Sequence, residues 1–155
     1  MRFKFAVAFA VAMAAAGAAE ACPNYNLRAA FGTITLPGGF LPDPYVRNVT
    51  AGGGYHLGNC GFNANGWVAS APDFQFSYSA AGYPLTIAIN SNTDTVLLIN
   101  APDGSWHFSD DDGIGPYGLG AAIYFPNPLG GVYDIWIGTY NQASGIPAQL
   151  VITEQ

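Results

Sequence analysis

The stretch TVLLINAPDGSWHFS, from Thr95 to Ser109, decides the fold class. An apolar run, TVLLIN, is followed by Ala-Pro-Asp-Gly and then by an aromatic run. Pro102, Asp103 and Gly104 are turn formers, and glycine adopts the left-handed backbone conformation that a tight turn needs. The pattern therefore predicts two antiparallel strands joined as a hairpin.

Alternation of apolar and polar residues continues outside this hairpin. Phe74–Ser79, Leu85–Asn90 and Gln149–Thr153 each alternate with period two, which predicts strands with one buried face. Thr95–Asn100 and Val132–Tyr140 are more continuously apolar, as is typical of strands covered on both faces.

Proline and glycine turn sequences separate these runs, and the chain from Cys22 on shows no helical repeat. Many short strands with such spacing predict an all-β fold, an antiparallel β-sandwich or jelly roll. We expect residues 22–155 to form one domain of this kind.

The first 21 residues have the pattern of a signal peptide. Arg2 and Lys4 precede an uncharged apolar run, and Ala19-Glu20-Ala21 fits an A-x-A cleavage site. The run is roughly a dozen residues, too short for a helix across a hydrocarbon core of ~30 Å, so no transmembrane segment is expected. The sequence predicts cleavage after Ala21 and a secreted or periplasmic protein.

Charge limits the partners of the remaining chain. From Cys22 on, the cations are Arg28 and Arg47, against nine acidic residues, which gives a net charge of −7. A surface with so few cations cannot neutralise phosphates, which argues against nucleic acid and anionic membranes as partners.

Cys22 and Cys60 both lie beyond the predicted cleavage site. Export delivers them to an oxidising compartment, so we expect a disulfide between them. The alternative is that Cys22 is a lipid-modified first residue, which would leave Cys60 as a lone thiol.

Residues for catalysis are sparse. The chain contains no G-x-S-x-G stretch, and its two histidines, His56 and His107, occur in unrelated surroundings. We therefore expect no enzyme activity. A secreted hydrolase that uses a pair of carboxylates stays open as an alternative, because nine acidic residues permit many pairs.

Three adjacent aspartates follow the hairpin. Alternation along a strand points Asp110 and Asp112 to one face and Asp111 to the other, unless the chain has already left the sheet. The hairpin turn brings Asp94 back near Asp110. Asp94, Asp110 and Asp112 are thus candidate ligands for a weakly bound Ca²⁺, since carboxylates are hard oxygen ligands. The alternative is a solvated acidic turn.

Tryptophans offer a binding surface for sugar rings. Trp136 is out of phase with Ile135 and Ile137, so it points outward if those two point inward. Asp134 shares its face. Trp136 and Asp134 are the candidate binding surface, and a carbohydrate-binding module is the alternative function.

Six motifs together resemble the bacterial pre-peptidase C-terminal domain family, over nearly the whole chain from Cys22 on. They are G-x-I-x-L-x-x-G-F-x-P-D-P (Gly32–Pro44), N-C-G (Asn59–Gly61), A-P-D-F (Ala71–Phe74), D-T-V-L-L-I-N-x-P-D-G-S-W (Asp94–Trp106), D-D-x-G (Asp110–Gly113) and G-x-Y-D-I-W-I-G-T-Y (Gly131–Tyr140).

This resemblance implies a secreted β-sandwich that is not itself catalytic. Such domains are usually appended to exported proteases and other secreted enzymes, and related modules bind calcium or extracellular polymers. The function expected from the resemblance is an accessory or binding role toward a secreted protein or an extracellular polymer.

Overall fold

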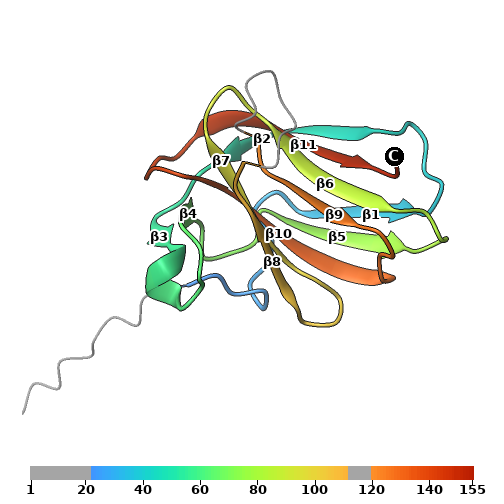
Figure 1. Ribbon diagram of the computed structural model, residues 1–155, viewed down its shortest axis with the longest axis horizontal. Helices are drawn as coiled ribbons and strands as arrows, with labels where there is room; N and C mark the ends of the chain where they lie inside the picture. The colour runs from blue at the N-terminus through green and yellow to red at the C-terminus, as the bar shows by residue number, and fades with distance from the viewer. Residues whose placement is uncertain (1–21, 112–119) are drawn as a thin grey trace, which may run out of the picture.

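The computed structural model describes residues 22–111 and 120–155, so the expected signal peptide lies outside the described part. Within that part, eleven strands and one short 3-10 helix form two sheets packed against each other (Figure 1). This confirms the predicted all-β sandwich. None of the described segments forms a helix long and apolar enough to cross a bilayer.

The larger sheet has seven strands. Its central strand is β10, which pairs with β5 on one side and β7 on the other, and β8 follows β7 at one edge. The strands are β1 (Thr33–Pro37), β3 (Tyr55–His56), β4 (Trp67–Val68), β5 (Phe74–Ser79), β7 (Thr95–Asn100), β8 (Trp106–Ser109) and β10 (Gly131–Thr139).

The smaller sheet has four strands in the order β2-β11-β6-β9, all antiparallel. They are β2 (Tyr45–Ala51), β6 (Leu85–Asn90), β9 (Ala122–Phe125) and β11 (Ile146–Thr153). Strands from the middle and from both ends of the described chain therefore lie side by side in this sheet (Figure 1).

The predicted hairpin is present as β7 and β8, with Gly104 at a φ of 81° in its turn. One pairing differs from the antiparallel expectation, because β1 runs parallel to β5. The chain leaves β1 for the smaller sheet as β2 before it returns, so these two strands are not constrained to be antiparallel as consecutive hairpin strands are.

The main core lies between the sheets. Alternate residues of each strand enter it, among them Phe76 and Ile135 from the larger sheet and Ile87 and Leu150 from the smaller one. Burial of this apolar surface is the main favourable contribution to folding.

A second core lies on the outer face of the larger sheet. Leu98 and Trp136 are paired across β7 and β10, and they pack there with Val68, Val96 and Leu57. The segment from β3 through the 3-10 helix (Leu57–Cys60) to β4 covers them.

This covering segment is held in place at two points, one in its middle and one at its end. The disulfide between Cys22 and Cys60, predicted from the sequence, ties it to the start of the described chain. Gly138 allows the end of the segment to approach, because a Cβ at this position would collide with the Trp67 carbonyl.

Candidate functional site

The outer faces of the two sheets differ. On the larger sheet, the segment from β3 to β4 covers the part around Trp136, while Thr33, Thr35 and Val132 beyond it are exposed. On the smaller sheet, outward side chains such as Val46 and Tyr124 are 47% and 60% exposed, and no described element packs over them. The outer face of the smaller sheet is thus accessible to a ligand along its described strands.

This open face carries no charge. The outward positions of the four strands alternate with core positions and are all neutral: Val46, Asn48, Thr50, Thr86, Ala88, Asn90, Ala122, Tyr124, Pro147, Gln149, Val151 and Thr153. A neutral face accords with a chain in which charged residues make up 9% of the sequence.

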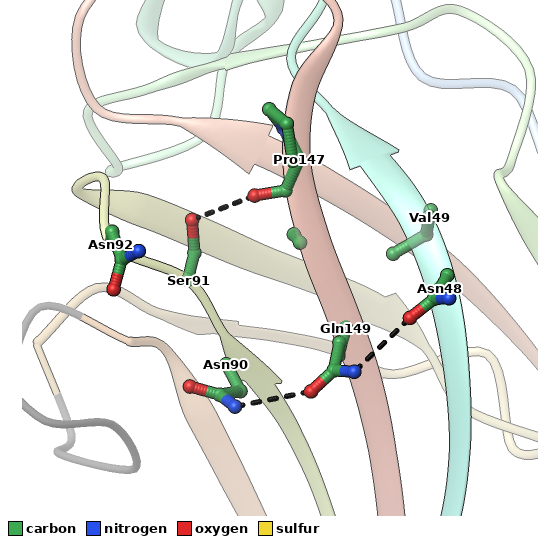
Figure 2. A pocket seen from close by; sticks show the side chains of 8 residues that line it. Asn48, Val49, Asn90, Ser91, Asn92, Pro147 and Gln149 are labelled. Atoms are coloured by element: carbon green, nitrogen blue, oxygen red, sulfur yellow. Dashed lines mark hydrogen bonds between the residues drawn. The ribbon is translucent and has the colours of Figure 1, made fainter.

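A row of three amides crosses the face. Gln149 of β11 lies opposite Asn48 of β2 and opposite Asn90 of β6. Asn90 Nδ2 donates to Gln149 Oε1 at 3.2 Å, and Gln149 Nε2 donates to Asn48 Oδ1 at 3.1 Å (Figure 2). The register of three strands therefore fixes the orientation of all three amides.

A groove of about 450 Å³ lies along this row. Its wall is completed by Val49, Ser91, Asn92, Pro147 and Ala148. Ser91 Oγ donates to the Pro147 carbonyl at 3.1 Å, which joins the end of β6 to β11 (Figure 2). No lining residue is ionisable, so the groove offers hydrogen-bond donors and acceptors but no group for proton transfer.

The expectation that Trp136 is a surface aromatic is wrong. Its side chain does point away from Ile135 and Ile137, as the alternation predicts, but it is fully buried. The covering segment from β3 to β4 turns the outer face of the larger sheet into a second core. Trp136 packs there, and its Nε1 donates to the Ser70 carbonyl at 3.3 Å.

Asp134, the other residue of that predicted surface, is buried as well, with 7% of its surface exposed. Its Oδ1 accepts a hydrogen bond from Gln75 Nε2 at 3.1 Å. Burial raises the pKa of Asp134, while the bond from Gln75 opposes that shift. The carboxylate is a structural partner of Gln75 and not part of a binding surface.

Trp106 is the exposed tryptophan that the sequence analysis did not single out. It lies on the edge strand β8, is 36% exposed, and has ring contacts with Tyr25, Phe62 and Trp136. Its position directly after a hairpin turn, on a short strand, was the available signal, because edge strands are less covered than central ones.

The structure brings together two of the three predicted metal ligands. Oxygens of Asp94, Asp110 and Asp111 all lie within 4.8 Å of one another. Asp112 lies outside the described residues. Asp111 joins the cluster by the exception that the alternation allows, because β8 ends at Ser109 and the chain has left the sheet there.

The carboxylates of this cluster repel one another. The pKa of Asp94 is raised, mainly by burial and to a smaller extent by the charge of Asp111. Oδ1 of Asp94 is inaccessible to solvent and has no hydrogen-bond partner among the described residues. A hard cation is the kind of ligand that would satisfy these oxygens.

Asp103, Ser105 and His107 form a hydrogen-bonded chain at the hairpin. Ser105 Oγ lies 2.6 Å from Asp103 Oδ1 and 2.9 Å from His107 Nε2. Hydrogen bonds from the Ser105 hydroxyl and from the Ser105 backbone N–H lower the pKa of Asp103, and its carboxylate is the acceptor of both. Ser105 therefore accepts from the histidine N–H, which is the reverse of a serine nucleophile activated by a histidine base.

The other histidine has a different partner. Its Nε2 is hydrogen-bonded to Asn65 Oδ1 at 2.9 Å, and the His56 ring packs edge-on against Trp67. The neighbour of His56 is thus an amide, which is not a nucleophile that a histidine base could activate.

Comparison with known proteins adds little. No family model and no curated protein matches the chain. One solved structure that matches is that of PliG from Aeromonas hydrophila, a periplasmic lysozyme inhibitor of g-type lysozyme, with 13% sequence identity. The match covers 79% of this chain and 96% of that one, with a TM-score of 0.36. At this level of similarity, the residues of the groove themselves must carry the functional argument.

Proposed function

We propose that the chain is an exported β-sandwich module that binds a partner and catalyses no reaction. The observation that carries this proposal is the amide groove on the open face of the smaller sheet. Its donors and acceptors are oriented in advance by hydrogen bonds between strands, and none of its lining residues is ionisable. Such a site can recognise a ligand but has no general base to activate the Ser91 hydroxyl.

The proposed location is outside the cytoplasm, in the periplasm or the medium. The disulfide between Cys22 and Cys60 supports it, because such bonds persist in oxidising compartments. The signal-peptide pattern of residues 1–21 points the same way.

The resemblance to the pre-peptidase C-terminal domain family is part of the proposal. The β-sandwich is compatible with this resemblance. The most specific motifs of the resemblance fall on the β7–β8 hairpin and on β10, at the centre of the larger sheet. The role that it suggests is accessory, toward a secreted protein or an extracellular polymer.

A weakly bound calcium ion is a second, structural element of the proposal. The specific observation that favours it is the convergence of Asp94, Asp110 and Asp111. In this role the ion stabilises the end of the β7–β8 hairpin and takes no part in catalysis.

The test uses the immobilised protein from Cys22 on. It is incubated with culture medium and periplasmic extract of the producing organism, and separately with insoluble cellulose, chitin and peptidoglycan. We expect a retained partner that the variant Gln149→Ala loses. The matched control is Thr153→Ala, on the same strand and face but outside the groove.

Two outcomes contradict the proposal. One is turnover of a peptide or glycoside substrate that a single carboxylate substitution abolishes. The other is that no molecule is retained, or that Gln149→Ala retains the same molecules as the unmodified protein.

A further inference from the structure

We infer that the ligand of the amide groove is a neutral glycan. This inference rests on the proposed function, because it names the class of molecule that the groove binds. It moves carbohydrate recognition away from the buried Trp136 to Asn48, Asn90 and Gln149.

The amide row leaves several of its hydrogen-bonding groups free for a ligand. The row uses one proton of Asn90, one proton and the oxygen of Gln149, and the oxygen of Asn48. The Asn90 carbonyl oxygen is turned away from Gln149, and the Asn48 amino group points away at the other end (Figure 2). Acceptors and donors are thus presented side by side along the groove.

Sugar hydroxyls match such a pattern. Each hydroxyl donates one hydrogen bond and accepts others, and an amide presents a donor and an acceptor in one plane. Neighbouring hydroxyls of a sugar ring can therefore engage both sides of one amide. Asn92 and Ser91 add a further amide and hydroxyl at the end of the groove.

The lining of the groove is uncharged. An anionic ligand would find no cation, since no lining residue is basic and Arg47 lies on the opposite face of β2, with its guanidinium 5.8 Å from the centre of the Phe74 ring. A cationic ligand would find no carboxylate in the groove. A neutral ligand, in contrast, brings no charge that this lining would have to compensate.

The shape of the face suits a chain-like ligand. A volume of about 450 Å³ lies in the range of small-ligand sites, and the groove lies on an open sheet face, so a longer chain can continue past it. Thr86 lies four residues from Asn90 on β6 and is paired with Tyr124 of β9. The exposed Tyr124 ring is thus ~13 Å along the strands from the amide row, where a further sugar ring can stack on it.

The three amide side chains are held in place before a ligand binds. Asparagine and glutamine side chains lose rotamer freedom when they bind a ligand, which weakens binding. Here the hydrogen bonds between the amides have already restricted Asn48, Asn90 and Gln149 on rigid strands. Such restriction in advance is what a weak, purely hydrogen-bonding ligand requires.

The test is electrophoresis in native gels that contain a soluble polysaccharide. The neutral probes are dextran, hydroxyethylcellulose, galactomannan and a β-1,3-glucan, and alginate is the anionic probe. We expect retardation by at least one neutral polysaccharide and none by alginate. Gln149→Ala, and separately Asn48→Ala, should weaken the retardation roughly tenfold, because each removes hydrogen bonds to the ligand.

Val132→Ala, at an exposed position of the larger sheet, is the control and should migrate as the unmodified protein does in every gel. Asn48 is exposed on its strand, so Asn48→Ala gives a folded variant even if Gln149→Ala disturbs the sheet, and far-UV circular dichroism checks both.

Retardation by none of the neutral polysaccharides overturns the inference, as does retardation that both groove variants retain in full. If retardation is absent but a protein partner is still retained through Gln149, the glycan assignment fails while the proposed binding function stands.

Discussion

The phenol of Tyr78 donates a hydrogen bond of 2.6 Å to Glu154 Oε1, which joins a core residue of the larger sheet to the end of the smaller one. The same carboxylate accepts from the backbone N–H of Gly39, in the connection between β1 and β2. Burial, and then the Glu154 carboxylate, raise the pKa of Tyr78, so the phenol stays protonated and keeps donating.

Removal of this phenol should therefore weaken the contact between the sheets. We expect Tyr78→Phe to lower the free energy of unfolding by about 1.5–3 kcal/mol, the range for a hydrogen bond to a charged group. Urea unfolding measures the effect. Tyr140→Phe, at an exposed tyrosine, is the control, and equal stabilities of the two variants would contradict the assignment.

Asp73 gives a pH-dependent prediction. Burial raises its pKa from 3.8 to about 7, against the effect of the Ile137 N–H, which donates to its Oδ2 at 2.6 Å. Between pH 4 and 7 the folded state holds the proton more tightly than the unfolded chain does. Stability contributed by the protonated carboxyl is therefore lost as pH rises through this window.

Asp73→Asn removes that titration and keeps an oxygen that can accept from Ile137. We expect the unmodified protein to lose up to about 4 kcal/mol more than the variant between pH 4 and 8. Urea unfolding at several pH values measures this difference. Parallel pH profiles of the two proteins would show that Asp73 is ionised in the folded state.

Strand positions were well predicted from the sequence, and for a clear reason. Phe74–Ser79, Leu85–Asn90 and Thr95–Asn100 form strands with the predicted bounds, since alternation or continuous apolarity is a local property of the chain. The hairpin turn at Gly104 was predictable for the same reason, because the turn-forming residues are neighbours in the sequence.

The burial of Trp136 was not predictable in the same way. Alternation tells which face of a strand a side chain occupies, but not whether another segment covers that face. The cover here consists of two-residue strands and a single 3-10 turn, which have no periodicity to detect.

The amide row could not be predicted from the sequence either. Asn48, Asn90 and Gln149 are 42 and 59 positions apart along the chain, and only the register of β2, β11 and β6 aligns them. Their residue types gave no signal individually, because asparagine and glutamine are common on any surface.

The disulfide should stabilise the cover over Trp136. By the chain-entropy model, a crosslink with a separation of 38 residues contributes about 4 kcal/mol, as an upper figure. We expect the double variant Cys22→Ser, Cys60→Ser to be less stable, and its tryptophan fluorescence to shift toward that of solvated rings. Thiol labelling of the unfolded, unreduced protein should be negative, and labelling of both cysteines would contradict the bond.

Calcium should act through the carboxylates that the structure brings together. With a Kd on the order of 10⁻⁴ to 10⁻³ M, as in extracellular modules, a hundredfold excess stabilises the fold by roughly 2.7 kcal/mol. The measurement is a thermal melt in calcium and in chelator at equal ionic strength, for the unmodified protein and for Asp111→Asn.

Asp111→Asn has a distinctive expected signature. In chelator it should melt no lower than the unmodified protein, because Asp111 is among the causes of the raised pKa of Asp94 and its loss relieves that repulsion. In calcium it should gain less, because one of the three converging carboxylates is gone. A bound cation must stabilise the folded state that binds it. If calcium changes the melting temperature of neither protein, these aspartates bind no calcium and contribute only charge.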